Sequence, residues 1–178
     1  AAKNVINDDW VDEIVFNLGV RFYKNATNLK AGEYAFTAGV SMHDVMTDLV
    51  EGNAVTHAVT IPEGWSTAQV LERLKENKIL KGEITEVPEE GALLPETYTF
   101  TRGMSRQELL NQMTKAQTKR LAEIWARRAE GLPIKTPEEL VILASIVEKE
   151  TAKADERPRV AGVFVNRLNR NMRLESDP

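Results

Sequence analysis

The chain has 178 residues, 28% of them charged, and a net charge of -4 at pH 7, a length that suits one medium domain or two small ones, each able to bury a core. The acidic balance lacks the basic excess with which proteins bind nucleic acid or an anionic membrane surface. The absence of cysteine excludes disulfide and thiol chemistry. His43 and His57 are too few and too far apart for a metal-ligand pattern, and no glycine-rich phosphate loop occurs, so no cofactor is expected.

Residues 1–30 are left unassigned. Between residues 9 and 23 the apolar side chains both alternate and cluster, which fits a helix, a strand, or one after the other. No run of about 20 apolar residues occurs, and the chain begins Ala-Ala-Lys without an initiating Met or a signal peptide.

Residues 31–81 are expected to form a small module made of a duplicated strand-turn-helix unit. Residues 34–53 and 59–78 align at a constant offset, which matches Gly39 with Gly64, Ser41 with Ser66, Val45 with Val70, Met46 with Leu71 and Leu49 with Leu74. Each copy has a short strand (residues 33–37 and 55–61), a glycine turn and a serine cap before an amphipathic helix. Asp44 and Gln69 stand three residues after the two serines.

This arrangement resembles the LysM-like peptidoglycan-binding modules, which implies a saccharide-binding unit. The repeated Val, Met and Leu residues are equally explained as core residues of a module that binds nothing. Trp65 lies in the loop before the second helix, and we expect it to stack on a sugar, because an indole ring is wasted if it is simply exposed.

Residues 81–91 are rich in Glu, Gly and Pro and are expected to be a connecting loop, with a domain boundary between residues 82 and 91. Residues 92–178 are expected to form a mainly helical domain, which makes the fold class α+β. Its first helix spans residues 105–128 and ends before Gly131 and Pro133.

A second helix begins at Thr136, where a capping box with Glu139 and a proline at the first helical position precede an apolar run. The helix ends with two acids, Glu148 and Glu150. At 100° per residue Glu150 stands over the apolar face, whereas Glu148 lies roughly 110° away from its centre. Glu150 is therefore expected to be the more buried acid, with a pKa raised toward the value that a general acid needs. The alternative is that it is solvated or paired with a basic residue.

A third helix is predicted after the polar turn of residues 155–158, with Val160, Val163, Phe164 and Leu168 at helical spacing. It is expected to pack against the second helix. It runs into an extended polar strip, Met172-Arg-Leu-Glu-Ser-Asp-Pro178.

Five motifs in this order resemble those of the endolytic murein transglycosylase (YceG-like) family. They are Leu94-Pro-Glu-Thr-Tyr98, Ala144-Ser-Ile-Val-Glu-Lys-Glu-Thr151, Glu156-Arg, Val160-Ala-Gly-Val-Phe-Val-Asn-Arg-Leu168 and Met172-Arg-Leu-Glu-Ser-Asp-Pro178. The resemblance extends over the whole chain and is sharpest from about Leu93 onward.

The resemblance implies that the catalytic acid is the second glutamate of the E-K-E triplet, which is Glu150. Other residues in these motifs are carried over as residues of the cleft or of its support: Glu148, Ser145, Glu96, Tyr98, Asn166, Arg167, Ser176 and Asp177. For Glu96 a turn residue after Pro95 is the alternative, and for Arg167 a structural ion pair.

The implied substrate is the bond between N-acetylmuramic acid and N-acetylglucosamine inside a peptidoglycan strand. Attack by the C6 hydroxyl of the same muramyl residue makes a second carboxylate unnecessary and leaves a 1,6-anhydromuramyl end, which limits strand length. Two alternatives stay open. One is a muramidase with Glu148, Glu96 or Asp177 as its second acid, and the other is a non-catalytic peptidoglycan-binding or scaffold protein of the cell envelope.

The resemblance also implies an N-terminal helix that anchors the protein in the inner (cytoplasmic) membrane, with the catalytic part facing the periplasm or outside and peptidoglycan synthases as possible partners. This chain is then expected to be the soluble portion. Because it stops inside the last motif, its catalytic domain is expected to be incomplete on the C-terminal side.

Overall fold

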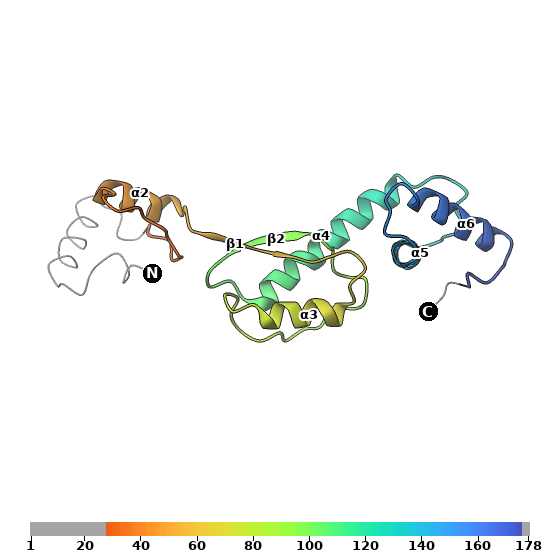
Figure 1. Ribbon diagram of the computed structural model, residues 1–178, viewed down its shortest axis with the longest axis horizontal. Helices are drawn as coiled ribbons and strands as arrows, with labels where there is room; N and C mark the ends of the chain where they lie inside the picture. Colours follow the sequence, from red (N-terminus) through yellow and green to blue (C-terminus); the bar gives the residue numbers. More distant parts are fainter. Residues whose placement is uncertain (1–27, 176–178) are drawn as a thin grey trace. The chain divides into compact units, whose positions relative to one another are not determined.

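The structure is a computed structural model that describes residues 28–175 (Figure 1). The ambiguous segment 9–23 and the motif residues Ser176 and Asp177 lie outside the described residues. The elements follow in the order α2 (Met42–Glu51), β1 (Thr56–Thr60), α3 (Thr67–Glu76), β2 (Thr97–Thr101), α4 (Arg106–Ala126), α5 (Pro137–Glu150) and α6 (Arg157–Asn169). The chain is therefore α+β, as expected from its sequence.

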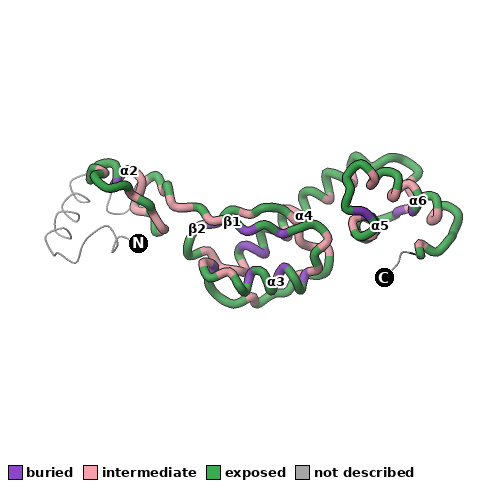
Figure 2. Tube along the Cα trace, viewed as in Figure 1, coloured by how far each residue is buried: buried purple, intermediate pink, exposed green. Residues whose placement is uncertain are grey.

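The chain divides into two compact units that interleave along the sequence. The first holds the described residues up to Val59, together with Ile79–Lys81 and Thr99–Met104. The second holds Thr60–Lys78, Gly82–Tyr98 and the described residues from Ser105 onward. Figure 2 shows buried residues in both. No helix of the described part of the chain is long and apolar enough to cross a membrane.

The two helices of the predicted duplication are present and have equal lengths. Both α2 and α3 have 10 residues, and each is capped by a serine, Ser41 and Ser66, whose hydroxyl oxygen accepts a hydrogen bond from a backbone N–H three residues later. Gly39 and Gly64 precede these caps at φ 85° and 74°, a left-handed conformation that favours glycine. The helical halves of the repeat are thus confirmed.

The strand halves differ between the copies. The second copy has β1, but the first copy's expected strand at residues 33–37 is not a strand, so that prediction is wrong. The Val55 N–H donates to the Glu33 carbonyl at 2.6 Å, and one such bond does not make a ladder. A segment of β-prone residues forms a strand only where a second strand pairs with its backbone N–H and C=O groups.

β1 pairs with β2 in a two-stranded sheet. The Thr60 and Thr97 hydroxyls lie 2.9 Å apart, and the Ile61 N–H donates to the Glu96 carbonyl at 3.0 Å, so the strands run antiparallel. Alternate residues of the strands are covered, with Val59 and Phe100 fully buried. The β2 strand was not among the elements predicted from the sequence.

The helices of the second unit begin where the sequence predicts. Ser105 and Glu108 form a capping box at α4, and the Glu139 N–H donates to the Thr136 hydroxyl at the start of α5. Only half of the second box forms, because the Glu139 carboxylate accepts the Lys135 N–H instead.

The α5 and α6 helices pack around a core of Ile134, Leu143, Val147 and Phe164. The α4 helix also contacts α5. Val163 was expected in this interface but is 55% exposed. The buried stripe of α6 instead follows Val160, Phe164 and Leu168, with Ala161 and Val165 beside it.

The guanidinium of Arg106, the first residue of α4, closes the end of α3. It donates to the carbonyls of Leu74 (2.8 Å), Lys75 (3.2 Å), Asn77 (2.8 Å) and Gly82 (2.9 Å). A lysine cannot reproduce this fork, so Arg106→Lys should lower the free energy of unfolding by about 2–4 kcal/mol in urea titrations. Arg120→Lys is the control, because its ion pair with Glu123 is exposed. Equal losses in the two variants would contradict this account.

Glu33 joins three segments of the first unit through its carboxylate. Arg102 donates at 2.8 and 3.1 Å and His57 lies at 2.7 Å, and these hydrogen bonds hold the pKa of Glu33 down at about 2, against an ordinary 4.5. A lowered pKa in the folded state gives stability that is present above pH 4.5 and lost as the pH falls toward 2. Glu33→Gln should therefore be less stable at neutral pH and lose less stability across that window, as measured by urea midpoints. Glu123→Gln should lose as much as the unmodified protein.

Candidate active site

The last turn of α5 holds the two acids that the sequence singles out. The side chain of Glu148 is 24% exposed, and its carboxylate pairs at 3.0 Å with Nη2 of Arg157, the first residue of α6. This ion pair ties the end of one helix to the start of the next.

Glu150 is the last residue of α5, and it is exposed. Among the described residues its carboxylate has no hydrogen-bond or ion-pair partner. The expectation that Glu150 is the more buried of the two acids is wrong. The helix ends at this residue and the chain continues in an extended conformation at Thr151 (φ −147°, ψ 128°), so no further turn covers the carboxylate. An accessible, unpaired carboxylate is suited to exchange a proton with a bound molecule.

The loop of residues 62–65, between β1 and α3, packs against the same end of α5. A Cβ built on Gly64 would lie 3.5 Å from Cγ of Glu148 and 3.7 Å from Cε of Lys149. Glu63 pairs with Arg157 Nη2 at 3.1 Å. The next residue, Trp65, has 38% of its surface exposed. The structure thus places the loop that carries Trp65 in the same unit as the acids, beside Glu148.

The Leu94-Pro-Glu-Thr-Tyr98 motif leads into β2 and supplies the first two residues of that strand. The Tyr98 hydroxyl donates to the Leu94 carbonyl at 2.8 Å. Burial, with a smaller contribution from the Glu96 carboxylate, raises the pKa of Tyr98 to about 12, so the phenol stays neutral near pH 7. The side chain of Glu96 is exposed, but its carbonyl holds the Ile61 N–H. This motif therefore supports the 62–65 loop through its backbone.

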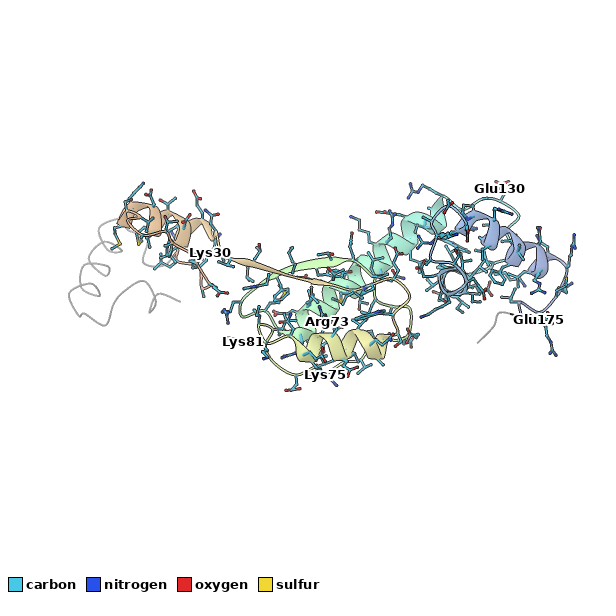
Figure 3. The ribbon with its side chains drawn as sticks, in the orientation of Figure 1. Lys30, Arg73, Lys75, Lys81, Glu130 and Glu175 are labelled. Carbon is cyan, nitrogen blue, oxygen red and sulfur yellow. The ribbon has the colours of Figure 1, made fainter. Side chains whose placement is uncertain are left out.

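The other predicted site residues point elsewhere within the described structure. The exposed Ser145 donates to the Ile142 carbonyl of its own helix at 2.8 Å. Arg167 holds the tail after α6, because it donates to the Leu174 carbonyl and pairs with Glu175 at 3.2 Å (Glu175 is labelled in Figure 3). Asn166 is exposed on α6. No hydrogen bond or ion pair between described residues joins Ser145, Asn166 or Arg167 to Glu148 or Arg157.

Sequence reasoning missed two residues that the structure joins to Glu148: Arg157, which pairs with it, and Glu63, which pairs with the same arginine. They are 94 positions apart, so no local spacing pattern links them. The one available signal is Glu156-Arg, which stands among the family-like motifs although no role followed from it.

The sequence matches the YceG-like family over residues 1–178. The chain belongs to this family. The family recognition made from the motifs is thus confirmed.

Relatives from two bacteria carry a functional name. An endolytic murein transglycosylase of Streptococcus pneumoniae is 29% identical over 198 residues, covering 87% of this chain and 35% of that protein. One from Bacillus subtilis is 26% identical over 204 residues, covering 97% and 56%. A crystal structure of a putative yceG-like protein from Listeria monocytogenes has a TM-score of 0.52 at 27% identity, covering 92% of this chain and 64% of that one. The chain therefore spans between about a third and just under two thirds of these relatives.

Proposed function

We propose that this YceG-like protein is an endolytic lytic transglycosylase that cleaves the bond between N-acetylmuramic acid and N-acetylglucosamine within peptidoglycan strands. The observation that carries the proposal is the accessible carboxylate of Glu150, which has no partner among the described residues. It stands in the motif by which the sequence resembles the YceG-like family, to which the chain belongs, and relatives are named endolytic murein transglycosylase.

In the proposed reaction Glu150 acts twice. It first gives a proton to the glycosidic oxygen as that bond breaks, and its carboxylate then takes the proton of the C6 hydroxyl as that oxygen bonds to the anomeric carbon. The product is a 1,6-anhydromuramyl end. Proton transfer of this kind contributes about 10²- to 10⁴-fold in rate, and the intramolecular position of the hydroxyl supplies much of the rest.

A muramidase would need a second acid to activate water. Glu148 is the nearest in sequence, but its carboxylate is occupied by Arg157 at 3.0 Å. A muramidase that uses Glu148 would therefore have to act through a carboxylate already paired with Arg157.

We propose that Trp65 and Tyr98 position the substrate. The partly exposed indole of Trp65 suits stacking on a sugar ring. The neutral phenol of Tyr98 donates to the Leu94 carbonyl and so supports the segment that leads into β2. We assign supporting or cleft roles to the remaining motif residues, which are Glu148, Ser145, Glu96, Asn166, Arg167, Ser176 and Asp177.

The division into a LysM-like module at residues 31–81 and a catalytic domain at residues 92–178 is also a proposal. The equal lengths and serine caps of α2 and α3 support the duplicated unit, although the two helices lie in different compact units. Since peptidoglycan lies outside the cytoplasm, we propose that the protein acts at the outer face of the cytoplasmic membrane, beside peptidoglycan synthases, and limits the length of new strands.

Glu150→Gln should abolish the formation of anhydromuramyl ends, with a loss of about 10²-fold or more in rate. Mass spectrometry of peptidoglycan digested by the protein of full native length measures these ends. Glu130→Gln, an exposed acid of the loop after α4 (labelled in Figure 3), is the matched control and should keep its activity. Retained activity in Glu150→Gln, or products that are one water heavier, would refute the proposal.

Trp65→Ala, made in the inactive Glu150→Gln protein, should weaken co-sedimentation with sacculi by about 5- to 10-fold, because one sugar-stacking contact is lost. Met42→Ala is the control, since Met42 is 37% exposed against 38% for Trp65. Equal binding by both variants would remove Trp65 from the substrate site.

A further inference from the structure

We propose that Arg157 is a positioning residue that fastens the 62–65 loop to the last turn of α5 by bridging Glu63 and Glu148. The inference rests on the proposed function, because the geometry that it fixes is the one in which Glu150 meets the sugar. Arg157 itself is not assigned a contact with substrate.

The bridge is made by a single nitrogen. Nη2 of Arg157 lies 3.1 Å from the carboxylate of Glu63 and 3.0 Å from that of Glu148. These residues belong to three segments: the loop after β1, the end of α5 and the start of α6. A planar guanidinium is suited to this task, because it presents its donors in a rigid fork and stays charged at all working pH values.

The arginine is only one-third exposed, with 33% of its side-chain surface accessible. Its Nε is buried and has no hydrogen-bond partner among the described residues. A buried donor without a partner lowers stability. The side chain is therefore held where the two carboxylates require it, although that position leaves one donor unsatisfied.

The bridge controls two features around Glu150. It pairs with Glu148, so that Glu150 is left as the unpaired acid of the last helical turn among the described residues. It also keeps Gly64 against Glu148 and Lys149, which fixes the backbone that leads into Trp65. Loss of Arg157 would free the loop and leave Glu148 without its counter-charge. Misplacement of a substrate by about 1 Å can cost about 10²-fold in rate.

The test is a double-mutant cycle in the protein of full native length, scored as kcat and KM for anhydromuramyl end formation. Arg157→Gln should lower kcat/KM by about 10- to 100-fold, mostly through kcat. Glu63→Gln should lower it by about 3- to 10-fold, because one anchor remains. The double variant should be no worse than Arg157→Gln, since Glu63 acts through Arg157. Arg157→Lys should recover part of the loss, and Arg120→Gln, an exposed arginine of α4, should lose nothing.

Hydrogen exchange gives a second readout that does not depend on activity. Arg157→Gln should speed amide exchange at residues 63–66, whereas Arg120→Gln should not. If Arg157→Gln fails to fold, Glu63→Gln still decides, because its side chain is 59% exposed and its loss is tolerable.

Unchanged kcat/KM in Glu63→Gln or Arg157→Gln, losses that multiply in the double variant, or unchanged exchange at residues 63–66 would each overturn the inference. A protein that produces no anhydromuramyl ends even when unmodified refutes the proposed function instead. The two failures are therefore distinguishable.

Discussion

The contact between the end of α5 and the start of α6 is the constraint on which the candidate site depends. Below it, Leu143, Val147 and Phe164 exclude water between the two helices. Above it, the ion pair of Glu148 with Arg157 fixes the last turn of α5. A helix end is ordinarily free to fray, because its last carbonyls lack partners. Here apolar packing and the ion pair together hold the terminal turn. The position of Glu150, the exposed acid of that turn, is therefore defined.

An arginine closes the end of α3 as well, but by a different means. Arg106 reaches backbone carbonyls, so it satisfies orphan groups of the helix itself. Arg157 reaches side-chain carboxylates from two other segments. The first arrangement stabilises one element, whereas the second joins elements. This contrast explains why the first arginine is tested through stability and the second through the reaction.

Helix starts could be predicted from the sequence because a cap is a local interaction. Ser41, Ser66, Ser105 and Thr136 each act within three residues, and each begins the helix that was expected. Strands need a partner that the local sequence does not specify. Residues 33–37 therefore do not form a strand. The alternating Thr97–Thr101 segment does form one, because it pairs with β1.

The candidate site could be predicted only in part. The motifs pointed to Glu150 and Glu148, but a helical wheel gives only the direction of a side chain and not what lies beside it, so the burial of Glu150 was misjudged. Glu63 and Arg157 meet across 94 positions, a relation that no periodicity records. The aligned turns before α2 and α3 differ in what surrounds them. Gly39 and Gly64 make the same turn, yet a side chain at Gly39 would meet no described atom within 4 Å, whereas one at Gly64 would face α5. The turn at Gly64 is therefore constrained both by its left-handed backbone and by the helix beside it, whereas the described structure around Gly39 leaves the backbone constraint alone.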